Sequence, residues 1–176
     1  MKTKQIILGI VLFTLVSCGQ KSGGFNISDY IQGEISDLEY SVSGDEVRVP
    51  YTKAGGVKTV KCLINGTILA DMIIDSGCST TLISIDEAKY LASKGALTSD
   101  DYLGDVQATI ADGSIVENAV FNIKSIVIAD KLEAKNVTVT VSANSDAPLL
   151  LGNEVLDRIA KWGLDNQSEE IVFTLK

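Results

Sequence analysis

The strongest signal in this sequence is the segment Met72-Ile73-Ile74-Asp75-Ser76-Gly77-Cys78-Ser79-Thr80-Thr81-Leu82-Ile83-Ser84. An apolar strand delivers a carboxylate, Asp75, to a turn that Ser76 and Gly77 build, and a second apolar strand leaves the turn. Such a pattern predicts a carboxylate at the floor of a cleft, held by a hydroxyl and by backbone N–H groups. Asp-Ser-Gly alone is a weak signal, because Asp-x-Gly turns are common on protein surfaces. The apolar frame around the motif is what makes it informative.

The composition excludes several classes of protein. The 176 residues include no histidine, which removes every Ser-His-Asp and Cys-His mechanism and every zinc site that contains histidine. Three cysteines cannot build a disulfide-dense scaffold or a four-cysteine metal site. The net charge of −8 argues against a nucleic-acid binder, which needs basic surface. If the chain is an enzyme, its acid–base groups are therefore expected to be carboxylates.

The N-terminus has the features of a secretory leader. Lys2 and Lys4 form a positive start, and the uncharged apolar run over residues 6–16 is too short to span a bilayer. The next residues resemble a bacterial lipobox, Leu15-Val16-Ser17-Cys18. This resemblance implies a lipoprotein signal peptide over residues 1–17 and lipidation of Cys18. A transmembrane anchor or a buried N-terminal helix is the alternative.

The rest of the chain divides into a tether and one domain. Residues 18–46 carry the lipidated Cys18 and are rich in Gly, Ser and Asp, so we expect a tether with one short ordered stretch at most. Residues 47–176 are expected to fold as one domain. The lipid would hold this domain to the cell envelope of a bacterium, on the periplasmic side or at the outer membrane. Its acidic body is not expected to bind anionic headgroups.

The pattern from Val47 onward predicts many short strands joined by hairpins, with two small helices. Asn65-Gly66 is a strong type I′ hairpin signal, and Ser84 with Glu87 fits a capping box that opens a helix ending near Gly95. Strands are expected over residues 47–49, 57–64, 67–74, 106–110, 115–123, 125–128, 136–142, 149–152 and 171–175. A polar loop is expected over 98–105, and a helical pattern covers 154–161. These elements describe a mainly-β barrel or sandwich.

Four motifs in order resemble those of the retropepsin-like aspartic proteases, and specifically of their single-domain bacterial members. They are the Asp75 segment, the hairpin tip Ala111-Asp112-Gly113-Ser114, the segment Leu150-Leu151-Gly152 with the helix after it, and Trp162 to Asn166 before a last strand. The resemblance covers residues 47–176, which is one family subunit. It implies a retropepsin-like acid-protease barrel with a flap hairpin and a short C-terminal helix.

The resemblance also implies the activity of an aspartic endopeptidase, a hydrolase that needs no metal and no cofactor. Such peptidases use two Asp carboxylates so close together that both cannot ionise, and the pair therefore shares one proton. One carboxylate acts as general base on a bound water, and the other donates to the scissile carbonyl. Because this chain has one Asp-Ser-Gly motif, the second Asp75 must come from a second copy. The implied partners are thus a second chain in a homodimer and a peptide or protein substrate.

The implied roles follow the motifs. Asp75 would be the catalytic carboxylate, Ser76 would bond across the two-fold axis, and Gly77 would let the backbone approach the partner carboxylate. Cys78 and Ser79 would complete the active-site loop. The hairpin tip would close over the substrate as the flap, with Ala111, Asp112, Gly113 and Ser114. The apolar segment Leu150, Leu151 and Gly152 would support the loop.

The sequence departs from the family pattern at two positions. The family most often has Thr and Ala where this chain has Ser76 and Cys78. Ser76 keeps the hydroxyl, and Cys78 is small and apolar enough to pack like Ala. We expect Cys62 and Cys78 to be buried thiols, with a disulfide between them or a redox role as alternatives.

Two rival functions are compatible with parts of this pattern. The same fold could act without turnover, as a lipoprotein that binds a peptide or protein partner. The chain could also be a generic β-barrel lipoprotein of the envelope. The intact Asp75-Ser76-Gly77 favours the protease over the first, and the four ordered motifs argue against the second.

Overall fold

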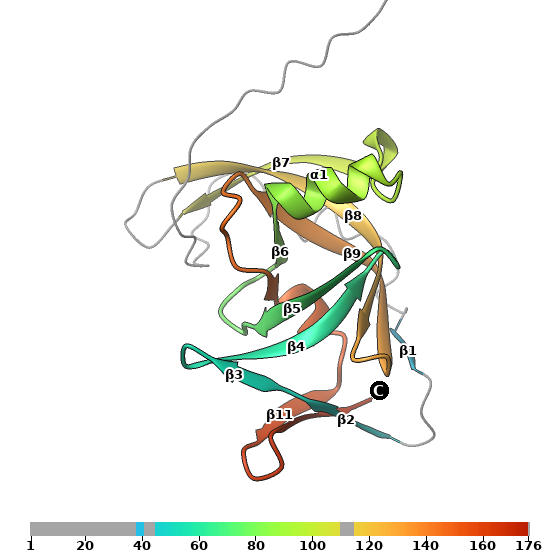
Figure 1. Ribbon diagram of the computed structural model, residues 1–176, viewed down its shortest axis with the longest axis vertical. Coiled ribbons are helices and arrows are strands. Elements are labelled where there is room, and N and C mark those ends of the chain that lie inside the picture. Colours follow the sequence, from blue (N-terminus) through green and yellow to red (C-terminus); the bar gives the residue numbers. More distant parts are fainter. Residues whose placement is uncertain (1–37, 41–44, 110–114, 176) are drawn as a thin grey trace, which may run out of the picture.

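The computed structural model describes residues 38–40, 45–109 and 115–175, which form two β-sheets with short helices (Figure 1). The strands are β1 (Leu38–Tyr40), β2 (Glu46–Pro50), β3 (Thr52–Ala54), β4 (Val57–Ile64), β5 (Ile68–Ile74), β6 (Thr81–Ser84), β7 (Tyr102–Thr109), β8 (Ile115–Ile128), β9 (Leu132–Ser142), β10 (Leu150–Leu151), β11 (Lys161–Asp165) and β12 (Glu170–Thr174). The helices are α1 (Ile85–Ser93), a short 3-10 helix (Ser99–Asp101) and α2 (Asn153–Leu156). The predicted mainly-β class is confirmed.

The larger sheet closes on itself. Its strand order is β1-β9-β6-β10-β5-β4-β8-β7, β3 pairs with β4, and an additional pairing of β8 with β9 joins the two ends of the central run. The smaller sheet has the order β11-β12-β2 and lies at the opposite end of the long axis from α1 (Figure 1). A closed sheet is a barrel, which is one of the two architectures that the strand pattern predicted.

One main hydrophobic core fills the barrel and reaches the smaller sheet. Alternate residues of β2 and β12 point inward, and Val47, Val49, Ile171 and Phe173 are all buried. The second half of β9 is buried at every position from 137 to 142. Continuous burial is expected for a strand that has protein on both faces.

Two turn and cap predictions are confirmed. Asn65 and Gly66 adopt positive φ angles of 46° and 60°, as a type I′ turn between β4 and β5 requires. Ser84 caps α1, and the reciprocal bond from the Ser84 backbone N–H to Glu87 completes the capping box. Ala88 and Leu91 then face the core.

Several element predictions were wrong in their extent, among them the strand expected over 136–142, which begins at Leu132 as β9. The runs 115–123 and 125–128 form one strand, β8, because pairing with β9 continues on both sides of the exposed Lys124. The segment 98–105 is not all loop, since β7 already starts at Tyr102 and pairs with β8. The helical pattern over 154–161 gives only the short α2, because Lys161 pairs with Thr174 in the smaller sheet.

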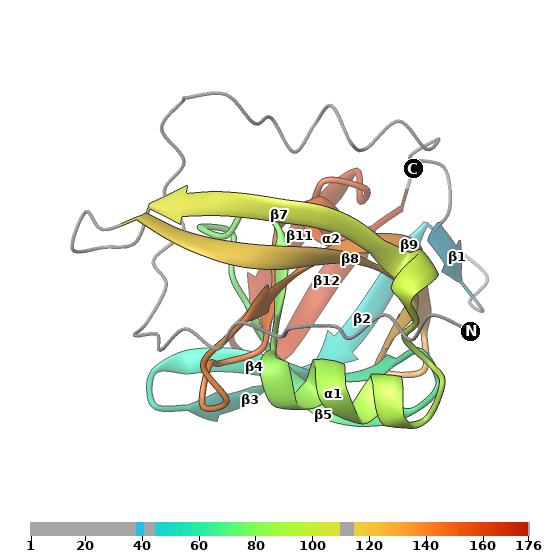
Figure 2. The ribbon, with the colours of Figure 1, turned by 90° about the horizontal axis from the view of Figure 1, so that it is seen from above.

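The hairpin of β7 and β8 projects from the body of the protein (Figure 2). The predicted flap tip, with Ala111, Asp112, Gly113 and Ser114, lies outside the described residues, as do Cys18 and the predicted signal peptide. Within the tether predicted over 18–46, the described residues Leu38–Tyr40 pair with β9. None of the helices among the described residues is long and apolar enough to cross a membrane.

The Asp75 loop spans residues 75–80 and connects β5 to β6, and β10 lies between these two strands. Leu150 and Leu151 pair in parallel with Ile73 and Ile74, and Leu150 also pairs with Leu82 of β6. Strand β10 therefore lies beneath the loop, and Gly152 is the first residue after this strand. A Cβ atom on Gly152 would lie 1.9 Å from the Thr80 carbonyl oxygen and 2.8 Å from that of Cys78. Only glycine fits at this crossing.

We predict that Gly152→Ala lowers the free energy of unfolding by about 1–3 kcal/mol or more. The backbone at residue 152 and the backbone of the Asp75 loop would have to move apart to admit the methyl group. Thermal or denaturant unfolding measures this change. Gly163→Ala is the matched control, since a Cβ there would meet nothing within 4 Å. If the two variants unfold alike, the crossing is not as tight as described.

Candidate active site

Asp75 lies where β5 ends and is held by a compact turn. Its backbone N–H donates to the Leu151 carbonyl at 3.1 Å, which extends the pairing of β5 with β10 by one residue. One carboxylate oxygen, Oδ1, accepts the Gly77 N–H at 2.8 Å, and the Asp75 carbonyl accepts the Cys78 N–H at 3.1 Å. Asp favours such turns because its short side chain reaches the backbone two residues on. The half-buried side chain is thereby fixed at the surface end of an apolar strand.

Gly77 lies close to the Asp75 side chain. A Cβ at Gly77 would lie 3.1 Å from Asp75 Oδ1, tighter than an ordinary van der Waals contact. A larger side chain would push against the carboxylate that the Gly77 N–H holds. The predicted approach of Gly77 to a partner carboxylate concerns a second copy and stays a prediction.

Cys78 and Ser79 lie on opposite faces of the loop. Cys78 is only 2% exposed and packs with Leu82, Leu150 and the half-buried Ile73, while Ser79 is exposed. Cys78 and Cys62 are both buried and form no disulfide, so the expectation of buried thiols is confirmed for this pair. Burial, with a contribution from Asp71, raises the pKa of Cys62 to about 12 and keeps its thiol protonated.

The start of α2 forms a second set of contacts with the loop. The Asn153 backbone N–H donates to the Cys78 carbonyl at 2.8 Å, and the Glu154 N–H donates to the Ser79 carbonyl at 3.1 Å. The Asn153 side-chain amide donates to the Ser76 carbonyl at 3.0 Å. The predicted support segment 150–152 and the predicted loop residues are thus brought together, with Asn153 as an additional member.

A buried ion pair anchors α2 to β9. Arg158 contacts Glu154 Oε1, and its guanidinium also donates to the carbonyls of Lys135 and Asn136, the latter at 3.0 Å. The side chains of Glu154 and Arg158 are only 3% and 7% exposed. Burial raises the pKa of Glu154 and outweighs the opposing effect of the Arg158 charge.

The sequence interpretation missed Asn153, Glu154 and Arg158 as contributors to this site. The spacing of Glu154 and Arg158 by four residues was an available signal, because such pairs meet on one face of a helix. Asn153 follows the Gly152 of a recognised motif, but nothing in the sequence shows which loop atom its side chain reaches.

The arrangement can supply one carboxyl group to bound water or substrate. At any moment this carboxyl acts either as a base or as an acid. Within the described ranges, no group of three or more His, Cys, Asp or Glu side chains could hold a metal ion.

Comparisons with known proteins agree with this geometry. The family model described as "gag-polyprotein putative aspartyl protease" matches residues 60–158, which include Asp75 and Gly152. A solved structure of a retropepsin-like aspartic protease from Rickettsia conorii is similar in fold, with a TM-score of 0.51 and 18% sequence identity. The match covers 79% of this chain and 94% of that protein, and it bears out the predicted retropepsin-like fold. No curated protein matches the chain. The chain therefore belongs to the retropepsin-like aspartic protease family.

Proposed function

We propose that the protein is an aspartic endopeptidase whose active site forms when two copies bring their Asp75 carboxylates together. The observation that carries this proposal is the Asp75 turn, in which a carboxylate at the end of an apolar strand is held by the Gly77 N–H. The chain contains a single Asp-Ser-Gly motif, so one copy supplies half of the required pair. A two-fold axis next to the loop would supply the other half.

In the proposed mechanism the two carboxyl groups share one proton. The ionised Asp75 takes a proton from a bound water, which attacks the scissile carbonyl, while the protonated Asp75 of the second copy donates to the carbonyl oxygen. The carboxyl that took the water proton then gives it to the amide nitrogen, the C–N bond breaks, and the other carboxylate regains a proton from the collapsing diol. The substrate would lie extended between the loop and the β7–β8 hairpin, paired as an added strand. Ser76 would bond across the axis and fix the two loops relative to each other.

The proposed dimer has a suitable surface in the edge strand β11. Among the described residues β11 pairs with β12 alone, so its other edge is open to another strand. Its sequence runs from Lys161 to Asp165 with Gly163 in the middle. Antiparallel pairing of two copies about Gly163 would set Lys161 opposite Asp165 of the other chain at both ends.

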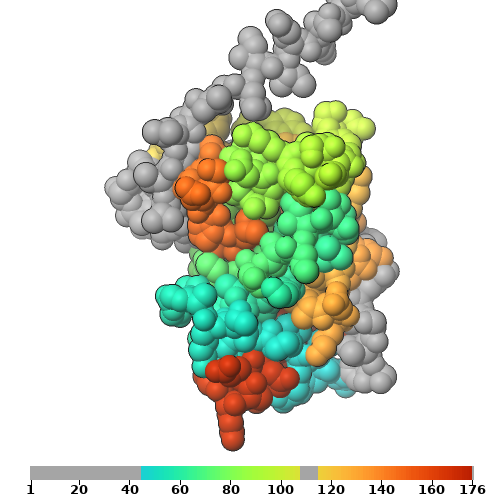
Figure 3. All heavy atoms as spheres, viewed as in Figure 1, coloured from blue at the N-terminus to red at the C-terminus, as the bar shows by residue number. Residues whose placement is uncertain are grey.

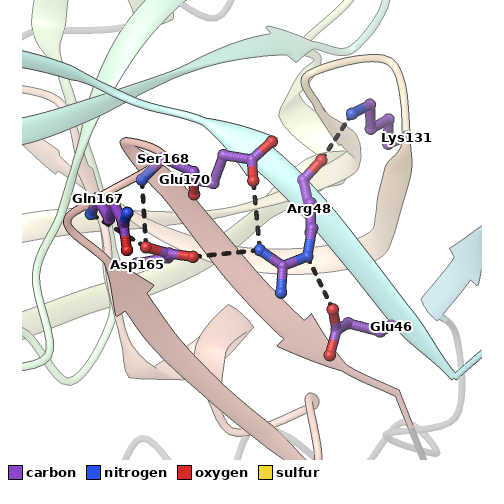
Figure 4. Close-up of polar contacts among 7 residues, drawn as sticks. All are labelled: Glu46, Arg48, Lys131, Asp165, Gln167, Ser168 and Glu170. Carbon is purple, nitrogen blue, oxygen red and sulfur yellow. Dashed lines mark hydrogen bonds and ion pairs between the residues drawn. The ribbon is translucent and has the colours of Figure 1, made fainter.

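The surroundings of β11 are compatible with this pairing. The hairpin of β11 and β12 lies at the surface at one end of the protein (red in Figure 3). A hollow of about 530 Å³ lies over it and includes the half-buried Trp162 and the 41% exposed Leu164. The Asp165 carboxylate accepts the Ser168 and Gln167 N–H groups and contacts Arg48 (Figure 4). The bond from Ser168 above all lowers the pKa of Asp165, which favours a charged carboxylate.

We further propose that the protein is held to the cell envelope by lipid on Cys18. Support comes from the sequence alone, from the lipobox-like residues 15–18 that follow a positively charged and then apolar start. A single acyl chain would hold a protein to a membrane only weakly, whereas the multiple acyl chains of a lipoprotein hold it stably.

The first prediction of the proposed function concerns cleavage. Purified wild-type protein should cut members of a peptide library between about pH 4 and about pH 7, and Asp75→Asn should lower the rate on the order of 10³-fold or more. The wild-type rate should rise faster than linearly with protein concentration and should be blocked by statine inhibitors. Cleavage that survives in Asp75→Asn would disprove the assignment. An inert wild type in its dimeric form would favour the peptide-binding alternative.

The second prediction concerns the β11 surface. Lys161→Glu and Asp165→Lys should each weaken the dimer by roughly ten-fold or more, because two ion pairs become two repulsions. An equimolar mixture of the two variants should recover both dimer and cleavage, since every pair across the interface is then attractive. Sedimentation velocity measures the first result, and the mixture itself controls for folding. Unchanged dimerisation in both variants would place the contact elsewhere.

The third prediction concerns the anchor. Cys18→Ser should abolish incorporation of labelled fatty acid and release the protein from the membrane fraction of an expressing bacterium. Cys62→Ser is the control, because Cys62 is buried in the core and should not affect labelling. Labelling that persists in Cys18→Ser would contradict the proposal.

A further inference from the structure

The peptide group between Ser76 and Gly77 lies between two side chains. Its carbonyl oxygen accepts the Asn153 amide at 3.0 Å, and its N–H donates to Asp75 Oδ1 at 2.8 Å. The two bonds leave one planar unit in opposite directions, because a trans peptide places its C=O and N–H on opposite sides. A rotation of this single peptide would therefore break both bonds together.

Among the described residues, this peptide makes none of the backbone–backbone hydrogen bonds that hold the rest of the loop. Gly77 lacks a Cβ, so the peptide that precedes it can turn over at little steric cost. The neighbouring contacts of the loop with α2 and β10 join backbone groups of Asp75, Cys78 and Ser79 and do not involve the 76–77 unit. The Asn153 side chain bonds the carbonyl end of this peptide, and Asp75 bonds its N–H end.

Asn153 is itself firmly placed. Its backbone N–H donates to the Cys78 carbonyl at 2.8 Å, and the next residue, Glu154, is held in the buried pair with Arg158. Because Arg158 is bonded to carbonyls of β9, the amide of Asn153 is carried by a rigid part of the barrel. The donor that meets the Ser76 carbonyl is thus set in position before any substrate arrives.

We propose that Asn153 is a positioning residue of the active site, which acts on Asp75 through the Ser76–Gly77 peptide. Donation from the amide to the carbonyl keeps the peptide in one orientation, and it also polarises the N–H that bonds Asp75. The inference deepens the proposed peptidase function and depends on it, because the carboxylate that Asn153 orients is the proposed catalytic group. Asn153 itself does not touch the reacting atoms in this arrangement.

The test compares three substitutions of the same residue. Asn153→Asp is nearly the same size but presents oxygen to the Ser76 carbonyl, Asn153→Ala removes the donor, and Asn153→Gln keeps an amide. Asn144→Asp is the matched control, because Asn144 uses its side-chain oxygen to accept the Asp146 N–H at 3.0 Å, a role that a carboxylate retains. Steady-state cleavage kinetics, pH–rate profiles and hydrogen exchange of the Gly77 amide are measured on each full-length protein.

The expected result is a fall in kcat of about ten-fold in Asn153→Asp and Asn153→Ala, with KM nearly unchanged. The acid limb of the pH–rate profile should move to higher pH in both, because a Gly77 N–H that turns away from Asp75 stabilises the charged carboxylate less. The Gly77 amide should exchange faster. Asn153→Gln should retain more activity than Asn153→Ala, and Asn144→Asp should behave like the wild type.

The outcomes separate this inference from the proposed function. Wild-type kcat, pH profile and Gly77 exchange in Asn153→Asp would overturn the positioning role, while cleavage that depends on Asp75 would still stand. If the wild type shows no cleavage that depends on Asp75, the proposed function fails. Hydrogen exchange of the Gly77 amide then tests by itself whether Asn153 holds the Ser76–Gly77 peptide in position. Equal exchange in the wild type and Asn153→Asp would overturn the positioning role, and faster exchange in the variant would support it.

Discussion

The close approach of Gly152 to the backbone of the Asp75 loop is the constraint on which the rest of the site depends. With the Thr80 and Cys78 carbonyl oxygens at 1.9 Å and 2.8 Å from where a Cβ would lie, β10 can pass under the loop only through a glycine. This crossing lets β10 pair with β5 on one side and with β6 on the other. It also delivers Asn153 and Glu154 to the loop carbonyls as soon as the strand ends.

The site that results holds one carboxylate, Asp75, in a well-defined position. Hydrogen bonds from Gly77 to the Asp75 side chain and from Cys78 to its carbonyl fix the carboxylate, and the buried Glu154–Arg158 pair fixes the helix beside it. One carboxylate cannot serve as base and acid at the same time. The proposed peptidase function therefore needs a second copy, and the edge strand β11 is the surface proposed to bind it.

The sequence was sufficient for local features that depend on a few adjacent residues. Asn65-Gly66 requires two positive φ angles, and Ser84 with Glu87 makes a reciprocal cap, so both were predictable from residue types. The fold class followed from ordered motifs such as Asp75-Ser76-Gly77, and the match to solved structures agrees with it. Extents of elements were less predictable, because tertiary pairing ended α2 early and carried β8 past Lys124. The bond of Asn153 to Ser76 joins residues far apart in the chain, and no local pattern encodes it.

Binding stoichiometry of a statine-type inhibitor tests the shared active site most directly. Titration calorimetry on the wild-type protein counts the chains that bind one inhibitor molecule, independently of any substrate. A dyad built from Asp75 of two copies requires one inhibitor for every two chains, with binding lost in Asp75→Asn. One inhibitor bound to each chain, or equally tight binding to Asp75→Asn, would contradict an active site shared between two copies.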